Sequence, residues 1–319
     1  MYKLSHRIEI GDWTVKRPSK VRIYRSVETL SDTAEVELPG MRGGQALEVE
    51  SQISVGDAVK IELGYDGELR EEFAGYVKRI GSDRGVVKIE CEDELWQTRR
   101  GVEDKEYRNV SVAELLADVL KQCGIETVRC SYDFRYDKFA VVNATGWDVL
   151  KKVQEEVKPN IYIEGGELVV APKYAGKESG RAAYDFRRNV EKGGTSLEWR
   201  KKEDRRIQVV VEGETRDGKR VRCEAGVTGG DKVTVKLPGV SDRESLQKRA
   251  DEILEEKSYT GYSGRISGWL TPYCTANYIV SLHDPAYEYK DGEYYVTAVE
   301  TEYGPGGGRR KIEIGKRLK

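Results

Sequence analysis

Apolar and polar residues alternate over much of the first hundred positions. The pattern is clear in Ala34–Pro39 and Asp57–Tyr65, where glutamates and lysines alternate with aliphatic residues. A period of two is typical of a strand with one buried face and one exposed face. Two further alternating runs cover Glu71–Ile80 and Val86–Asp93, and an Asp-Gly pair at 66–67 predicts a hairpin turn. The spacing predicts a small antiparallel β-barrel over residues 1–100.

The period changes from two to that of a helix in the next segment. Ser111–Cys123 and Thr145–Val157 each place apolar residues on one helical stripe, and each begins with Ser or Thr followed three positions later by an acidic residue, as in a capping box. Two short runs, Ile161–Glu164 and Glu167–Ala171, predict a hairpin. We predict a small α/β domain over 101–175 with its own core around Leu116, Leu120, Trp147 and Leu150.

The last part of the chain returns to alternating runs and predicts a second β-barrel over 176–319. A predicted helix, Asp242–Ser258, interrupts it, with Ser241 and Glu244 as the expected cap. The expected strands are Arg205–Glu212 and Lys219–Glu224 around a turn at Asp217-Gly218, then Lys232–Leu237, Tyr262–Trp269, Tyr278–Leu282, Tyr294–Thr301 and Arg309–Ile314.

A short internal similarity indicates that the two β-rich parts are related. Phe73–Ile80 resembles Gly292–Val299, and each lies between two predicted strands. The glycine-rich segment Gly304–Gly308 is interpreted as a long flexible hairpin tip. The predicted fold class is mainly β with an α+β insertion, consisting of two related small antiparallel β-barrels and a small α/β domain.

Composition and charge exclude several classes of protein. The 319 residues include 54 Lys and Arg against 56 Asp and Glu, a net charge of -2, which disfavours a basic nucleic-acid binder. No apolar run approaches the roughly 18 residues of a membrane span, and Met1–Gly11 lacks the apolar region of a signal peptide, so no membrane anchor is expected. Five widely spaced cysteines and two histidines, His6 and His283, predict free thiols and neither a metal site nor a cofactor.

Charged pairs and runs supply few candidates for catalysis. The carboxylate pairs Glu71/Glu72, Glu155/Glu156 and Glu255/Glu256 adjoin basic residues on predicted solvated faces, whereas an acid catalyst needs a desolvated carboxyl group. The basic runs lie at Arg187-Arg188, Arg200–Lys202, Arg205-Arg206 and Arg309–Lys311, and acidic residues flank most of them. We interpret these runs as solvated or interface faces. The candidate interface residues are Arg200, Lys201, Lys202, Arg205 and Arg206.

An ordered series of motifs resembles the phage baseplate hub proteins of the tail late-control protein D group, which are related to the hub part of type VI secretion spike proteins. The resemblance covers most of the chain, and its specificity comes from the order of the motifs. The matching segments are Val27–Gly40 (VETLSDTAEVELPG), Phe73–Ile80, Thr145–Leu150 (TGWDVL), Asn160–Tyr174, Tyr184–Val190 (YDFRRNV), 201–209, Tyr259–Gly268, Gly292–Val299 and Arg309–Leu318. The chain departs from the family at Cys274–Asn277, where a glycine is expected before Tyr278.

The resemblance implies a function as a structural, non-enzymatic baseplate hub of a contractile phage tail or a prophage-derived injection machine. It implies a homotrimeric ring that adapts a hexameric tail tube to a trimeric spike, and that is made in the bacterial cytoplasm and located in the virion tail baseplate. No specific nucleic-acid binding is expected, although DNA could pass through the ring. Because the chain ends at Lys319, soon after the last predicted strand, a separate spike protein is expected.

Two alternatives and two further expectations follow. One alternative is a tail-associated cell-wall hydrolase, which needs a pocket that holds a metal or a carboxylate with a perturbed pKa. The other is a single-stranded nucleic-acid-binding barrel protein, which needs a basic groove with aromatic side chains.

In the hub, the middle domain is expected to lie outside the ring and to be dispensable for barrel folding. The ring is expected to close through a heterologous contact between a strand edge of one copy and the other barrel of the next, with charges such as those in Arg200–Arg206 fixing the register.

Overall fold

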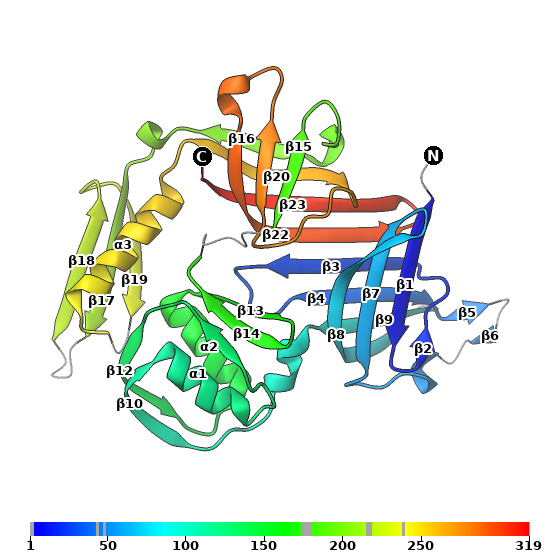
Figure 1. The fold of residues 1–319 in the computed structure, drawn as a ribbon, viewed down its shortest axis with the longest axis horizontal. Helices are drawn as coiled ribbons and strands as arrows, with labels where there is room; N and C mark the ends of the chain where they lie inside the picture. Colours follow the sequence, from blue (N-terminus) through cyan, green and yellow to red (C-terminus); the bar gives the residue numbers. More distant parts are fainter. Residues whose placement is uncertain are drawn as a thin grey trace.

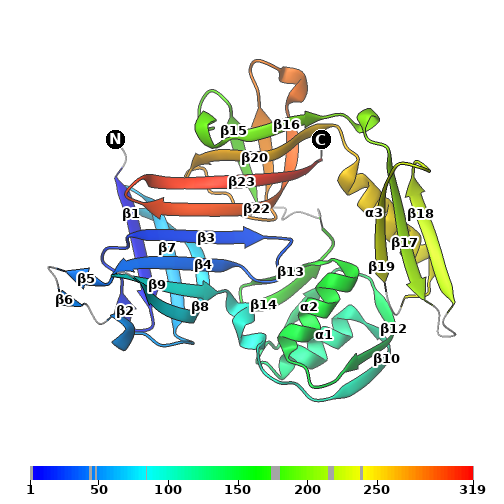
Figure 2. The same ribbon diagram turned by 180° about the vertical axis from the view of Figure 1, so that it is seen from behind.

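One large sheet, to which both ends of the chain contribute, dominates the computed structural model (Figures 1 and 2). The structure describes residues 3–42, 45–46, 49–83, 85–173, 180–214, 219–237 and 240–318. The N-terminal strands of the sheet are β1 (Leu4–Ile10), β2 (Trp13–Thr14), β3 (Lys20–Ser26), β4 (Thr33–Pro39), β7 (Ala58–Tyr65), β8 (Glu68–Asp83) and β9 (Val86–Glu92). The C-terminal strands are β15 (Arg181–Asp185), β16 (Ser196–Arg200), β20 (Gly261–Trp269), β21 (Ile279–His283), β22 (Gly292–Gly304) and β23 (Gly307–Arg317).

The two sets of strands meet where β22 pairs antiparallel with β3. The sheet runs in the order β16-β20-β23-β22-β3-β4-β9-β8-β7-β1-β2, and β21 pairs with both β22 and β15. The prediction of a mainly β chain is therefore confirmed. Within the described residues, the strand pairings form one open sheet that spans both sets, and they do not close two separate barrels.

Alternation explains why these segments are strands. In β4 the side chains of Ala34, Val36 and Leu38 are buried while the glutamates between them face outward, as the pattern predicts.

The segment Gly304–Gly308 is not the long flexible tip that was expected. Gly304 pairs with Gly307, so β22 and β23 run into a two-residue turn. Gly307 has a φ of 112°, which favours glycine at that position.

The two sets of strands share one order of neighbours. The N-terminal set runs β3-β4-β9-β8-β7-β1, and the C-terminal set runs β16-β20-β23-β22-β21-β15. Each pairing in the first set has a counterpart of the same orientation in the second, except that β1 pairs antiparallel with β7 whereas β15 pairs parallel with β21. We call these sets the first and second repeat.

The middle unit follows β9 and contains two helices, each begun by the predicted capping box. In α1, Ser111 and Glu114 form the reciprocal hydrogen bonds, and in α2, Thr145 and Asp148 form them. The elements are β10 (Lys105–Ser111), α1 (Val112–Lys121), β11 (Val128–Cys130), β12 (Arg135–Val141), α2 (Gly146–Val157), β13 (Asn160–Glu164) and β14 (Glu167–Ala171).

An outer unit lies between β16 and β20 in sequence and beside the middle unit in space (Figure 1). It consists of β17 (Ile207–Glu214), β18 (Arg220–Gly226), β19 (Asp231–Leu237) and α3 (Arg243–Lys257). The N-cap of α3 is Asp242, whose carboxylate accepts a hydrogen bond from Ser245 N at 2.8 Å, so the predicted cap at Ser241 was wrong. The turn predicted at Asp217-Gly218 lies outside the described residues. The last residue of β16 pairs with the first residue of β20, so the outer unit is an excursion from a β-hairpin.

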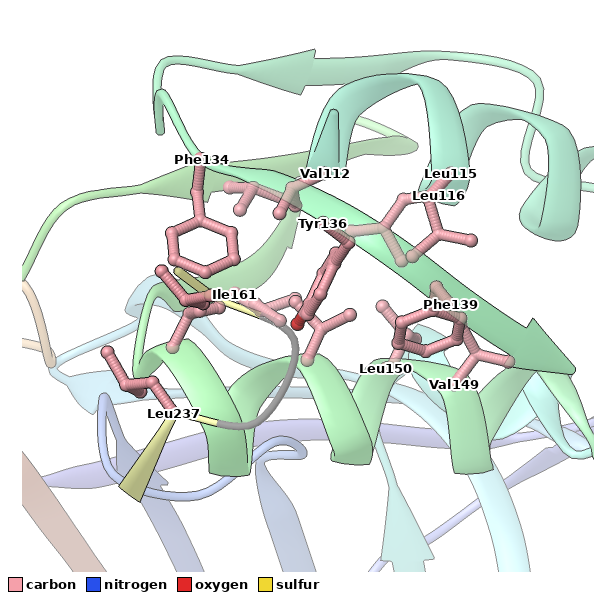
Figure 3. Packing of buried hydrophobic residues seen from close by; sticks show 14 of the residues in the cluster. Val112, Leu115, Leu116, Phe134, Tyr136, Phe139, Val149, Leu150, Ile161 and Leu237 are labelled. Atoms are coloured by element: carbon pink, nitrogen blue, oxygen red, sulfur yellow. The ribbon is translucent and has the colours of Figure 1, made fainter. Parts of the chain in front are cut away.

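The middle unit does not have the separate core that the sequence predicted. One cluster of buried side chains contains Leu116 and Leu150 of the middle unit together with Val209, Leu237 and Leu246 of the outer unit. Figure 3 shows Leu237 at the end of β19 packed among side chains of the middle unit. The middle unit buries apolar surface against an element that comes later in the chain, which the helical stripes alone could not show.

Candidate assembly site

A buried ion pair holds the two repeats together. Arg310 of β23 is 1% exposed and Glu72 of β8 is 4% exposed. The guanidinium donates to both carboxylate oxygens, at 2.7 and 3.0 Å, in a bidentate arrangement. The same guanidinium donates to the carbonyl oxygens of Leu270 (2.9 Å) and Cys274 (3.2 Å), and it lies over the ring of Tyr273. Arg310 therefore joins the first repeat to the loop that follows β20.

This pair corrects two interpretations made from the sequence. The sequence predicts Glu72 on a solvated face with Glu71, and Arg310 in a basic run on a solvated or interface face, yet both side chains are buried within the chain. Burial raises the pKa of Glu72, and the nearby guanidinium groups of Arg310 and Arg25 oppose that effect. Alternation with Ile312 and Ile314 places Arg310 on the buried face of β23. Glu72 is buried directly before Phe73 because the pairing of β7 with β8 shifts at this point, which alternation does not show.

The exposed face of the large sheet carries a network of ion pairs that crosses the contact between repeats. Arg22 on β3 lies 3.2 Å from Glu300 and 3.6 Å from Glu302 on β22. Lys311 on β23 contacts the same two glutamates at 3.4 and 3.3 Å. Arg22 and Lys88 both contact Glu35, which extends the network. Two separate ion pairs join neighbouring strands of the same sheet, Arg79 with Glu90 and Arg265 with Glu313. Basic and acidic residues are present in equal number, so this ion-pair face has no net charge.

Several strand edges of the large sheet have no neighbouring strand in the part of the chain that the structure describes, and two of them lie on β8 and β16. β7 leaves β8 at the pair Ala58 and Tyr76, so the second edge of β8 lacks a strand partner from Lys78 to Ser82. β16 pairs with β20 on one side only, which leaves its other edge open over Ser196–Arg200. Unpaired edges are templates for pairing with another chain.

The predicted interface residues lie at and just beyond the open edge of β16. Arg200 is the last residue of that strand, and its Nε lies 3.1 Å from Glu198 Oε2. The other four residues lie on the exposed link to β17, around a single 3-10 turn: Lys201, Lys202, Arg205 and Arg206. Only Arg200 is thus placed on the sheet edge, and a role for the five residues in assembly stays a prediction.

A groove lies between the repeats at one end of the sheet, near the turn between β22 and β23. Its volume is about 1270 Å³, and leucines and aromatic side chains form much of its wall, including Leu63, Tyr65 and Trp269. Tyr65, at the tip of the β7–β8 hairpin, donates a hydrogen bond to the carbonyl oxygen of Gly308 at 3.1 Å. The hairpin tip of the first repeat therefore docks on the β22–β23 turn of the second.

Asp93 is a partly buried carboxylate, next to the buried Glu92, that the sequence did not indicate. It lies where the chain leaves β9 for the middle unit and lines a cleft of about 320 Å³ beside β13 and β14. One carboxylate oxygen accepts hydrogen bonds from Ser31 Oγ (2.9 Å) and Leu95 N (3.0 Å), and the other accepts one from Asp32 N (2.7 Å). Burial, and then the charge of Asp32, raise the pKa of Asp93 to about 7.

We expect the free energy of unfolding to fall as the pH rises from about 5 to about 8. The pKa of Asp93 is higher in the folded chain than in an unfolded chain, so in this window the folded state binds more protons, and raising the pH removes that stability. The hydrogen bond to Asp291 raises the pKa of His283, which adds a contribution of the same sign. Urea unfolding across this pH window measures the fall.

Two variants separate the contributions to this pH dependence. Asp93→Asn should flatten the profile, whereas His283→Asn should leave a fall of at least about 1 kcal/mol, which corresponds to roughly one pKa unit. A free energy of unfolding that rises between about pH 5 and about pH 8 would show that Asp93 is ionised throughout.

Solved structures with a similar fold include tail proteins of phage origin. The 43 kDa tail protein of prophage MuSo2 from Shewanella oneidensis has a TM-score of 0.69 and 16% identity, over 98% of each chain. A tail protein from Neisseria meningitidis MC58 has a TM-score of 0.68 and 16% identity, over 99% of this chain and 97% of that one.

A third structure extends the similarity beyond phage tails. The E. coli c3393 protein, a component of the type VI secretion system that resembles bacteriophage tail proteins gp27 and gp5, has a TM-score of 0.60 and 10% identity, over 98% of this chain and 77% of that one. No protein-family model and no curated protein matches the sequence. The chain thus has the fold of phage tail proteins, and the resemblance stated from the sequence is confirmed for the fold.

Proposed function

We propose that the chain is a structural baseplate hub of a contractile phage tail or of a prophage-derived injection machine. Three copies form a ring between a hexameric tail tube and a trimeric spike. The observation that carries the proposal is the pair of repeats with the same strand order in one sheet. Three chains with two repeats each present six similar surfaces to the tube and keep threefold symmetry for the spike. The fold shared with tail proteins supports this assignment.

The proposal includes a division of labour along the chain. Residues 1–100 and 176–319 supply two related barrel-like parts of the ring, and residues 101–175 form a middle domain at its periphery. The common order of strands supports the relation between the two barrel-like parts. The outer unit is an excursion from the β16–β20 hairpin and packs on the middle unit, so it belongs to the periphery as well.

The ion-pair face suits the wall of a channel through which DNA passes. A polyanion is held where basic residues are in excess, because affinity comes from neutralising phosphates and releasing counterions. On this face the basic side chains of Arg22, Lys88 and Lys311 already contact glutamates. DNA would therefore slide past the surface without being retained. The same balance disfavours the alternative of a single-stranded nucleic-acid binder, whose groove needs a basic excess.

The carboxylates of the chain are used in ways that disfavour a hydrolase. Glu72 accepts a bidentate contact from Arg310, and both oxygens of Asp93 accept hydrogen bonds from its own chain. Glu72 is therefore not available to give a proton to a substrate, and the hydrogen bonds to Asp93 hold that group against its own chain. Over the described ranges, no cluster of three or more His, Cys, Asp or Glu side chains could hold a metal ion.

None of the helices in those ranges is long and apolar enough to cross a membrane.

Native mass spectrometry and sedimentation over a concentration series test the proposal. We expect a species of three times the 36.1 kDa chain mass, formed by the chain alone or on addition of the tail tube and spike proteins of the same phage or injection machine. Electron microscopy of that species should show a ring with a central channel. A stable dimer, or a chain that stays monomeric with its tail partners present, would overturn the hub assignment.

A further inference from the structure

We infer that a second copy of this chain occupies the open edges of β8 and β16, so that β16 of one copy adds antiparallel to β8 of the next in a defined register. This inference rests on the proposed ring. It differs from the general expectation of edge pairing because it names the opposed residues, and because it places an exposed aromatic loop of one copy on an exposed apolar patch of the next.

The register comes from a backbone irregularity that both repeats share. In the first repeat, the pairing of β8 with β9 shifts between Val77 and Arg79. In the second, the pairing of β22 with β23 shifts between Val296 and Ala298. Both shifts follow the point where the strand leaves its other neighbour, β7 or β21. The two bulges align β8 with β22 residue by residue.

Within one chain, the segment of β22 beyond its bulge is covered by β3. Val299 lies opposite Arg25, Glu300 opposite Tyr24, and Thr301 opposite Ile23. The equivalent segment of β8 is Ile80–Ser82, and the equivalent of β3 is β16.

The pairings with β4 and β20 fix how β3 and β16 correspond. Ala34 of β4 and Gly264 of β20 occupy equivalent positions in the two repeats. Ile23 lies opposite Ala34 and Leu197 lies opposite Gly264, so Ile23 and Leu197 are equivalent as well. Transferring the internal register to the open edges places Ile80 opposite Trp199, Gly81 opposite Glu198 and Ser82 opposite Leu197 of the next copy.

This register brings charged side chains together on one face and apolar side chains on the other. Arg79 lies opposite Arg200 of the next copy, as Ala298 lies opposite Ser26 within one chain, and each arginine contacts a glutamate of its own chain, Glu90 or Glu198. On the opposite face, Ile80 meets the Trp199 ring.

The hairpin tips provide a second contact across the same joint. In one chain, the β7–β8 tip docks through Tyr65 on the end of β20 and on the β22–β23 turn. The equivalent tip of the second repeat is the loop between β21 and β22, where Tyr287 is 51% exposed and Tyr289 is 68% exposed. Lys290 lies over both rings.

The equivalent landing site on the next copy is the end of β4 and the start of β9. Met41 is 53% exposed there and Val86 is 36% exposed. Four exposed large apolar side chains, located at different ends of the sheet within one chain, therefore meet across one joint. Tyrosines that pack on an apolar patch are a common core of protein interfaces.

Site-directed cross-linking tests the register. A variant with Ser82→Cys and Leu197→Cys should form covalent trimers on mild oxidation, because opposed strand residues bring their Cβ atoms within disulfide range. Neither single substitution should do so. A matched control, Ser82→Cys with Val227→Cys, places the second thiol on an exposed residue of the outer unit and should give no trimer band.

Assembly measurements separate this inference from the proposed function. Tyr289→Glu should weaken trimer formation at least tenfold in sedimentation, whereas Val227→Glu, at another exposed apolar position, should not. Trimers that form without the Ser82–Leu197 cross-link and that tolerate Tyr289→Glu would overturn the joint and leave the hub function standing. A wild-type chain that forms no ring under any of these conditions would overturn both.

Discussion

Replacing Arg310 with alanine is expected to lower the free energy of unfolding by about 3–5 kcal/mol, because it leaves the buried carboxylate of Glu72 without its counter-charge. The carbonyl oxygens of Leu270 and Cys274 lose a donor at the same time, in a place that water reaches poorly. The loss should be a large fraction of the roughly 5–15 kcal/mol by which a native protein is typically stable. Denaturant unfolding followed by tryptophan fluorescence measures it.

Three variants show whether the loss arises from the buried charge. Glu72→Gln combined with Arg310→Met removes both charges and should be less destabilised than Arg310→Ala. Arg309→Ala, on the neighbouring and more exposed position of β23, removes an ion pair with Glu191 and should cost only about 0–1 kcal/mol. Equal losses in the single and double variants would mean that Arg310 acts through its volume and not through its charge.

The sequence predicted those features of the fold that depend on local periodicity and capping. Alternation identified β4, β7, β8 and β9, and the Ser111–Glu114 and Thr145–Asp148 pairs identified the starts of both middle helices. These signals are readable because each depends on residues a few positions apart. The Asp242 cap was missed because Ser241 and Asp242 are adjacent and both residue types favour that position.

Long-range partners could not be read from the same signals. Arg310 and Glu72 lie 238 positions apart, and nothing local marks either residue as the partner of the other. Both lie in runs of like charge, where one member must face the core if the run is a strand. Strict alternation with Ile312 and Ile314 would have identified Arg310 as a buried charge. It would have chosen Glu71 over Glu72, because β8 has a bulge before Phe73, and it would not have shown the pairing.

The interface residues were predicted from charge, and charge was an incomplete guide. Of the five basic residues, only Arg200 lies on a strand edge, since the chain leaves the sheet directly after it. The open edges of β8 and β16 became visible only when the order of strands was known. Trp199, Tyr287 and Tyr289 were not singled out, because exposed aromatics look like core residues until burial is known.

Leu237→Ala is expected to destabilise the middle unit although Leu237 belongs to the outer unit. The side chain is 2% exposed and lies in the cluster that contains Leu116, Leu150 and Ile161 (Figure 3). Truncating a buried leucine typically costs about 2–5 kcal/mol through lost burial and the cavity left behind. Because the cluster is shared, hydrogen exchange should accelerate in α1 and α2 as well as in β17–β19.

A matched substitution distinguishes a shared core from two independent ones. Val227→Ala removes an exposed apolar side chain from the same unit and should change the free energy of unfolding by no more than about 0.5 kcal/mol. If Leu237→Ala left exchange in α1 and α2 unchanged while β17–β19 lost protection, the two units would unfold separately. In that event the middle unit could be removed from the ring without the outer unit. If α1 and α2 lose protection together with β17–β19, any shortened chain must omit both units or neither.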